Sequence, residues 1–143
     1  MSPSEPGLSG RCYCGAALLS FVAPPQTVAY CHCNDCRRWT GGPVAAFAAF
    51  DRSALRATPP LGEPLRPATG VERWSCPTCG SPLAARFDYL PTQVYVPLGI
   101  LDQIDTLPPA LHCHAGSAPP WLHIVDDLPR HAGSARSSLN GAS

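Results

Sequence analysis

The stretch Cys31-His32-Cys33-Asn34-Asp35-Cys36 packs three cysteines into six residues. Two cysteine pairs flank it along the chain, Cys12-Tyr13-Cys14 before it and Cys76-Pro77-Thr78-Cys79 after it. Short spacings of this kind suit tetrahedral zinc coordination by thiolates. The clusters hold seven of the eight cysteines, and a zinc ion bound only by protein takes four ligands. Seven ligands fit one closed four-cysteine site and one three-cysteine site with an open position, which is the arrangement of a catalytic zinc.

The two outer pairs can meet at a single ion. Residues two apart in an extended strand point to the same side, so Cys12 and Cys14 can both face a metal. In the later pair, Pro77 fixes one backbone angle and Gly80 permits a positive φ, which together make the tight turn of a zinc knuckle. The sequence therefore predicts a structural zinc that staples the N-terminal strand to a distant hairpin.

The middle cluster leaves other assignments open. Spacing alone permits Cys31 and Cys33 to close the structural site, or a two-metal cluster that shares sulfurs. It also permits a second closed zinc whose fourth ligand comes from elsewhere, with the candidates His32, His112, Cys113, His114 and His123. A disulfide framework is a further alternative, and a reducing compartment disfavours it.

Composition indicates one globular domain. The chain has 143 residues, of which 45% are hydrophobic, and its 18 prolines and 12 glycines favour short strands and turns over long helices. We expect a zinc domain over residues 10–132, between a flexible lead-in at 1–9 and a flexible tail at 133–143. Both ends are rich in small and polar residues and lack apolar periodicity.

Charge and the terminal sequence exclude several classes of partner. The ten basic residues are all arginine and balance ten acidic ones. Two zinc ions on seven thiolates would shift this zero net charge by −7 + 4, to about −3. A negative charge does not suit phosphate binding, so we expect no nucleic-acid partner. No stretch has the pattern of a secretory signal or a transmembrane helix, so we expect a cytoplasmic protein without membrane attachment and with reduced cysteines.

Short apolar segments predict a mainly β, mostly antiparallel fold. Alternation in the first segment places Ala17, Leu19 and Phe21 on one side of a strand. One helical turn is expected over 51–56. The predicted strands cover residues 16–22, 27–31, 44–50, 72–75, 83–87, 93–99 and 121–125.

The three cysteine motifs, in this order, resemble those of the glutathione-dependent formaldehyde-activating enzyme family, whose domain is shared with the centromere protein V group. The motifs are Gly10-Arg11-Cys12-Tyr13-Cys14-Gly15, Cys31-His32-Cys33-Asn34-Asp35-Cys36-Arg37 and Cys76-Pro77-Thr78-Cys79-Gly80-Ser81. The resemblance covers about residues 10–130. It implies an Mss4-like, mainly β fold in which short antiparallel sheets are stapled by zinc knuckles.

The resemblance also implies two zinc ions per chain and an enzymatic activity. The family's namesake reaction joins formaldehyde to glutathione to give S-(hydroxymethyl)glutathione, formally a carbon–sulfur lyase acting in reverse. We therefore expect a zinc-dependent carbon–sulfur lyase acting on a small thiol adduct, with a thiol such as glutathione as partner. The implied ligands are Cys12, Cys14, Cys76 and Cys79 for a structural zinc, and Cys31, Cys33 and Cys36 for a catalytic zinc.

Residues beside the middle cluster are candidates for further roles. His32 and Arg37 are candidate catalytic groups, and Arg37 and Arg38 could hold a substrate carboxylate or act as counter-charges to the thiolates. The proline-rich stretch 57–64 offers no recognisable glutathione pocket, so the cysteine motifs carry over and glutathione specificity does not. The alternative is a non-catalytic zinc-binding module for protein interaction.

Overall fold

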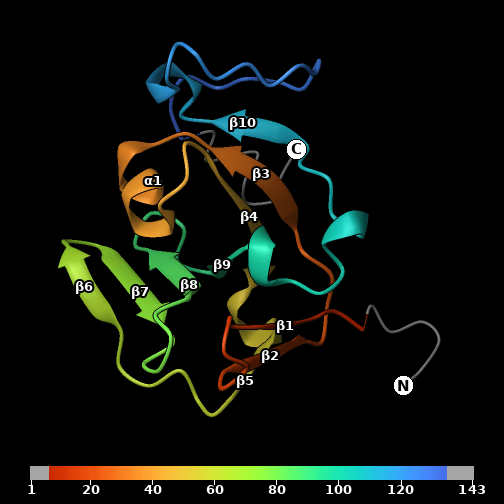
Figure 1. Cartoon of the computed structure of the whole chain (residues 1–143), viewed down its shortest axis with the longest axis vertical. Helices are drawn as coiled ribbons and strands as arrows, with labels where there is room; N and C mark the ends of the chain where they lie inside the picture. Colours follow the sequence, from red (N-terminus) through yellow and green to blue (C-terminus); the bar gives the residue numbers. More distant parts are fainter. Residues whose placement is uncertain (1–6, 135–143) are drawn as a thin grey trace.

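The computed structural model describes residues 7–134, which form short strands, one helix and several 3-10 turns (Figure 1). Of the described residues, 38% are in strands and 15% in helices, which confirms the predicted mainly β fold. The helices are α1 (Asn34–Thr40), η1 (Arg52–Ala54), η2 (Leu98–Ile100), η3 (Ile104–Thr106) and η4 (Ala115–Ser117). The strands are β1 (Ser9–Arg11), β2 (Leu18–Phe21), β3 (Thr27–Cys31), β4 (Ala45–Asp51), β5 (Leu55–Thr58), β6 (Leu65–Ala68), β7 (Val71–Ser75), β8 (Pro82–Phe87), β9 (Gln93–Pro97) and β10 (Leu111–Cys113).

The strands form two sheets. The small sheet has the order β1-β2-β5, and the large sheet has the order β10-β3-β4-β9-β8-β7-β6. Paired strands run antiparallel except β10 and β3, which run parallel. The small sheet lies at one end of the molecule, and β10 lies at the other (Figure 1).

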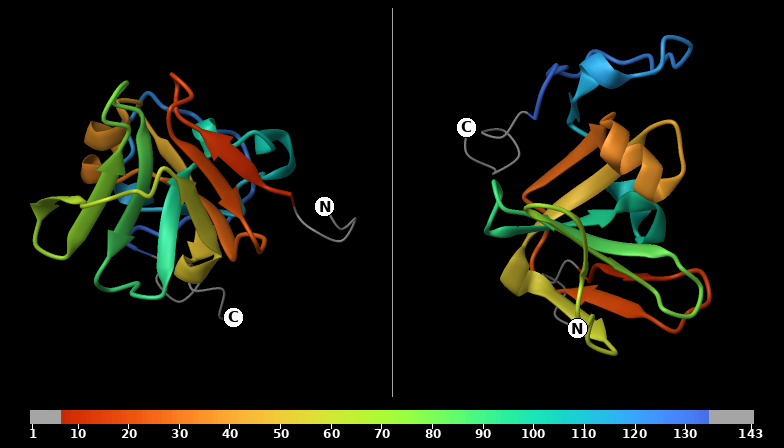
Figure 2. Two further views of the ribbon diagram at one scale, coloured as in Figure 1. Left: turned by 90° about the horizontal axis from the view of Figure 1, so that it is seen from below. Right: turned by 90° about the vertical axis from the view of Figure 1, so that its left-hand side faces the viewer.

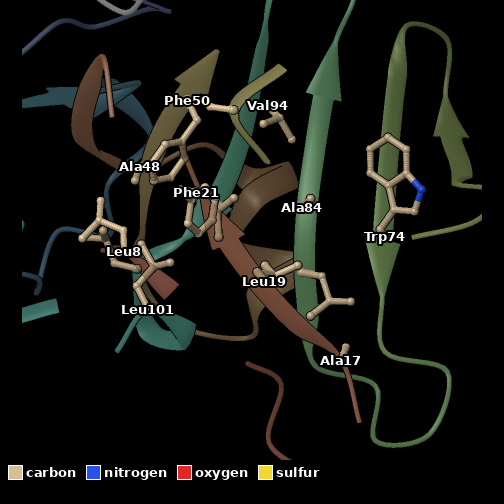
Figure 3. Close-up of a cluster of buried hydrophobic side chains, with 14 of the residues drawn as sticks. Leu8, Ala17, Leu19, Phe21, Ala48, Phe50, Trp74, Ala84, Val94 and Leu101 are labelled. Atoms are coloured by element: carbon tan, nitrogen blue, oxygen red, sulfur yellow. The ribbon is translucent and has the colours of Figure 1, made fainter. Parts of the chain in front are cut away.

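The small sheet packs on one face of the large sheet through an apolar core (Figure 3). Phe21 of β2 stacks on Phe50 of β4, with ring centroids 4.0 Å apart. Ala17, Leu19 and Phe21 are buried while Leu18 is exposed, which confirms the alternation expected in this strand.

The opposite face of the large sheet carries a second apolar cluster. Ala48 and Phe50 of β4 belong to the first core, and Phe47 and Ala49 belong to the second cluster. Because β4 is buried on both faces, its sequence is continuously apolar rather than alternating, as expected for the predicted buried strand. Cys36 of α1 also packs in the second cluster, so the helix covers part of this face.

The prediction of a strand over residues 121–125 is wrong. These residues form no strand, and Trp121 is 66% exposed and Val125 97% exposed. They belong to a C-terminal arm, residues 118–134, that lies at the end of the molecule opposite the small sheet (Figure 1; Figure 2, right view). The apolar alternation of the arm has no sheet face to pack on, so it does not produce a strand.

The segment expected as a lead-in includes residues that the structure describes. Leu8 is buried, and β1 begins at Ser9, whose hydroxyl donates to Asp102 at 2.7 Å. Residues 1–6 of the predicted lead-in and 135–143 of the predicted tail lie outside the described residues. Within residues 7–134, no helix has the length and apolar composition needed to cross a bilayer.

The C-terminal arm is attached to the outer edge of β10. His112 donates its backbone N–H to the carbonyl of Pro129 at 2.9 Å. The Asp126 carboxylate lies 3.0 Å from Nε2 of His112 and 2.8 Å from Nη1 of Arg130. Burial raises the pKa of Asp126, but hydrogen bonds from His112, the Leu128 N–H and Arg130 outweigh it and lower the pKa to about 2.

Replacing Asp126 with asparagine should release the arm, because the neutral amide loses its ionic hydrogen bonds. Since the folded pKa is depressed, the anchoring by Asp126 is present above about pH 4 and is lost as the pH falls through about 2. At neutral pH we expect amide hydrogen exchange in residues 118–130 to be roughly tenfold faster in Asp126→Asn. Exchange in β4 should be unchanged, and Asp127→Asn, at an exposed neighbour, is the control. Equal protection of the arm in both variants would contradict this role.

Candidate metal centres

Four cysteines from two turns converge on one point. The turn between β1 and β2 and the turn between β7 and β8 bring the four Sγ atoms within 4.8 Å of one another. The Sγ atom of Cys14 is 3.6 Å from that of Cys12 and 3.9 Å from that of Cys76. A tetrahedral zinc with Zn–S bonds of about 2.3 Å has sulfur–sulfur edges of about 3.8 Å, so this spacing fits zinc and not a disulfide. The four-cysteine group is Cys12, Cys14, Cys76 and Cys79.

Local hydrogen bonds favour the thiolate form of two members of the four-cysteine group. The backbone N–H of Ala17 donates to Sγ of Cys12 at 3.2 Å and lowers the pKa of Cys12. A hydrogen bond with the Ser81 hydroxyl, 3.2 Å from the sulfur, lowers the pKa of Cys79 to about 5. Gly80 closes the knuckle at φ 80°, a conformation that suits glycine. The N–H of Ala16 lowers the pKa of Cys14, but burial and hydrogen bonds with the other three sulfurs raise it to about 11. The turns therefore favour thiolates at Cys12 and Cys79, and a bound cation would favour ionisation of Cys14 as well.

The second group is the trio of Cys31, Cys33 and Cys36. Cys31 ends β3, Cys33 is the N-cap of α1, and Cys36 lies in the first part of the helix. The Sγ atom of Cys31 is 3.5 Å from each of the other two sulfurs. The N–H of Cys36 donates to Sγ of Cys33 at 3.2 Å. The sulfur of Cys33 therefore caps the helix and also lies beside the other two sulfurs of the trio. These distances match three corners of a tetrahedral zinc site.

Without a cation, the three cysteines of the trio do not all ionise. Hydrogen bonds to Cys33 and Cys36 raise the pKa of Cys31 far above its ordinary value. The reciprocal bonds from Cys31 and Cys36 lower the pKa of Cys33 to about 2. The protein alone thus stabilises one thiolate and keeps Cys31 protonated. A bound divalent cation would allow all three sulfurs to ionise.

The positions of these side chains decide among the ligand sets that the sequence left open. The trio and the four-cysteine group are separate, so Cys31 and Cys33 do not close the other site. Among residues 7–134, no further histidine, cysteine or carboxylate atom joins the trio. Two of the candidate fourth ligands pair with each other instead: Nε2 of His32 lies 2.8 Å from Nδ1 of His112.

The trio opens onto a cavity of about 290 Å³ on the second face of the large sheet. Burial raises the pKa of Tyr89 to about 12 and that of Cys113 to about 11, so both side chains are protonated at neutral pH. The lining is mostly apolar, and its polar members include Asp35 and His114. Besides the trio, the walls are formed by Ala29, Asp35, Phe47, Val71, Phe87, Tyr89, Leu90, Tyr95, Cys113 and His114.

The structure divides the other candidate residues between this cavity and positions away from it. His32 is buried and lines a different cavity with His112. Arg37 is hydrogen-bonded to the Asn34 side chain on α1, and neither Arg37 nor Arg38 lines the cavity of the trio. Of the segment 112–114, Cys113 and His114 do face this cavity, since Cys113 lies beside Cys31 in the parallel pair of β10 and β3.

A buried arginine beside the site was not expected from the sequence. Arg73 is 3% exposed, and its Nη2 donates to the carboxylate of Asp35. Its guanidinium lies 4.4 Å from the ring centroid of Trp39 and 5.5 Å from that of Phe87. Its Nη1 is buried without a hydrogen-bond partner. Arg73 and Val71 are two residues apart in β7 and therefore share a face of the strand, while Trp74 packs in the core on the other face. The available signal was an arginine inside the strand predicted over 72–75.

Arg73→Met should weaken metal binding at the trio. Methionine preserves much of the side-chain volume but removes the positive charge that offsets the thiolates. We expect the zinc affinity of the trio to fall about 10- to 100-fold, as for other supporting residues of metal sites, while the four-cysteine group is unaffected. Competition with a chromophoric chelator measures both affinities. Arg66→Met, which removes an exposed ion pair with Glu72, is the control. Unchanged affinity in Arg73→Met would contradict the role.

The model of the glutathione-dependent formaldehyde-activating enzyme family matches residues 7–117. The chain belongs to this family. The matched segment contains all seven clustered cysteines and every residue that lines the cavity, and it ends before the C-terminal arm.

Two further similarities agree with this membership. A Schizosaccharomyces pombe protein named as an uncharacterized lyase is 28% identical over 78 residues, which are 54% of this chain and 56% of that protein. The chain thus matches little more than half the length of this curated relative. The crystal structure of a Rhodobacter sphaeroides protein is similar with a TM-score of 0.53 and 26% identity, covering 66% of this chain and 87% of that one.

Proposed function

We propose that the chain is a zinc-dependent carbon–sulfur lyase-like enzyme that acts on the adduct of a small thiol and an aldehyde such as formaldehyde. Family membership and the lyase name of the yeast relative support this assignment. One observation carries it: three cysteine sulfurs at zinc spacing open onto a cavity, and no fourth protein ligand joins them among residues 7–134. A structural zinc is closed by four protein ligands, whereas a catalytic zinc keeps one position for substrate.

We assign the four-cysteine group to a structural zinc. It lies where the small sheet meets the β7–β8 hairpin of the large sheet, so the ion would tie the two sheets together. The trio would hold the catalytic zinc, which supplies Lewis acidity and favours the thiolate form of a bound thiol. The expected stoichiometry is two zinc ions per chain.

The residues of the chain would perform the remaining tasks. The apolar walls would exclude water, and the protonated phenol of Tyr89, which lines the cavity, would donate a hydrogen bond to the oxygen of the adduct. Arg73, paired with Asp35, offsets the charge of the thiolates. In the synthetic direction the thiol sulfur bonds to the aldehyde carbon and the thiol proton ends on the former carbonyl oxygen. The reverse step restores both reactants without redox change.

Exchange NMR tests this proposal. The zinc-loaded chain is mixed with ¹³C-formaldehyde and a series of thiols that includes glutathione, and the rate of adduct formation is compared with the spontaneous rate. We expect acceleration with at least one thiol and none with the zinc-free chain. A chain that binds two zinc ions but accelerates the reaction with no thiol would overturn the proposal.

The second candidate is a non-catalytic zinc-binding module for protein interaction. The exposed apolar residues of the C-terminal arm, Trp121 and Val125, favour it. This candidate requires both metal sites to be closed by protein ligands. The cavity at the trio favours the enzyme instead.

A further inference from the structure

Four aromatic rings form one continuous wall of the cavity. Phe47 of β4 meets Tyr95 of β9 edge-on, with ring centroids 6.4 Å apart and an interplanar angle of 80°. Phe87 of β8 meets the same tyrosine at 5.6 Å and 69°, and Tyr89 follows Phe87 at 5.8 Å. All four residues line the cavity together with the trio. Such a wall offers edge-to-face and offset contacts to a further aromatic ring.

Charged groups that could hold an ionic ligand are scarce in this lining. Asp35 is the acidic member, and its carboxylate is already bonded to Arg73. Within the described part of the chain, His114 is the basic side chain of the lining, no arginine lines the cavity, and the sequence contains no lysine. Glutathione carries two carboxylates and an ammonium group at neutral pH. A buried carboxylate without a cation or several hydrogen-bond donors is strongly disfavoured.

Arg73 does not supply the missing cation. Its guanidinium is paired with Asp35 and lies against the rings of Trp39 and Phe87, and it is not part of the lining. Its charge is therefore directed to the carboxylate on α1 and to the neighbouring thiolates rather than to a guest in the cavity.

The size of the cavity points to a small guest. Its volume of about 290 Å³ lies at the lower end of the range for ligand pockets, roughly 300–1,000 Å³. One substituted ring and a sulfur suit this space better than an extended tripeptide with charged ends.

From the ring wall, the lining without arginine or lysine, and the size, we infer that the cavity receives the aromatic group of a small thiol, or of the adduct of that thiol with an aldehyde, in preference to glutathione. This inference rests on the proposed function, because it places the thiol sulfur at the trio and the ring against Phe47, Phe87 and Tyr95.

Thiol binding to the cobalt-substituted full chain tests the inference without measuring turnover. The visible absorption of Co(II) changes when an added thiolate enters its coordination, so each thiol can be titrated. The probes are benzyl mercaptan, glutathione and 2-mercaptoethanol, which has neither ring nor charge. We expect benzyl mercaptan to bind about 10- to 100-fold more tightly than glutathione, since burial of a phenyl ring contributes that much.

The outcomes separate the inference from the proposed function. If glutathione binds as tightly as benzyl mercaptan or more tightly, the substrate class is wrong and the proposed function stands. If none of the three thiols changes the cobalt spectrum, the trio does not accept a thiol, and the proposed function itself is wrong.

A pair of variants that add the same charge, one in the lining and one outside it, tests the inference further. Val71 is half-buried at the start of β7, so the long side chain of Val71→Arg can be accommodated with its head near solvent. We expect this variant to bind benzyl mercaptan about tenfold more weakly and glutathione more tightly. Val125→Arg adds the same charge on the exposed arm and should change neither affinity. Cobalt content and melting temperature verify that both variants are folded. An unchanged preference in Val71→Arg would overturn the inference.

Discussion

Cys76→Ser is expected to leave the domain unfolded. Cys76 is buried at the meeting point of the two sheets, and its loss leaves three sulfurs for the structural zinc. Binding of a structural zinc contributes roughly 10–16 kcal/mol, which equals or exceeds the total stability of about 5–15 kcal/mol for an ordinary domain. Circular dichroism should therefore show no cooperative melting, and metal analysis should find less than one zinc ion per chain.

The control for this experiment is Cys113→Ser. Cys113 is also buried but belongs to neither cysteine group, so this variant should fold and retain two zinc ions. A Cys76→Ser protein that melts cooperatively at the wild-type temperature would show that the four-cysteine group does not hold the sheets together.

Cys33→Ser is expected to abolish activity while preserving the fold. The sulfur of Cys33 has two tasks, since it faces the other sulfurs of the trio and caps α1. Serine is a favourable N-cap, so the helix keeps its capping acceptor, but a hydroxyl is a poor replacement for a thiolate on zinc. Zinc content should fall from two ions to one, and adduct formation should return to its spontaneous rate.

Thermal melting of Cys33→Ser should remain cooperative, because the structural zinc is retained. Cys113→Ser again serves as the control, with two zinc ions retained. If Cys33→Ser kept both zinc ions, the trio would not be a metal site. If it lost one ion but kept full activity, the metal at the trio would not be catalytic.

The cysteine groups could be predicted from the sequence because metal knuckles are local patterns. CxC and CxxC spacings fix which sulfurs can share an ion, and β3 and β4 were recognisable from short apolar runs. The helix α1 was not expected, because its seven residues follow directly on the cysteine cluster and resemble a turn. β6 was missed because all its residues are exposed and show no apolar alternation.

The cavity could not be predicted, because its lining is assembled from distant segments. Cys31 and Cys113 are brought side by side only by the parallel pairing of β3 with β10, and Arg73 reaches Asp35 across 38 residues of sequence. No local pattern encodes such contacts. Arg37 and Arg38 adjoin the cysteines in sequence, yet Arg37 is hydrogen-bonded to Asn34, Arg38 is exposed, and neither lines the cavity. The cytoplasmic location and the absence of a nucleic-acid partner remain predictions from composition.

The pairing of β10 beside β3 also sets an order of events during synthesis on the ribosome. All ligands of the four-cysteine group have been translated once Cys79 is made, whereas the wall containing Cys113 and His114 comes more than thirty residues later. Under the proposed assignment, the nascent chain can therefore acquire its structural zinc while the trio is still uncovered on one side. Metal supply at that early stage would govern how much of the newly made protein escapes aggregation and proteolysis.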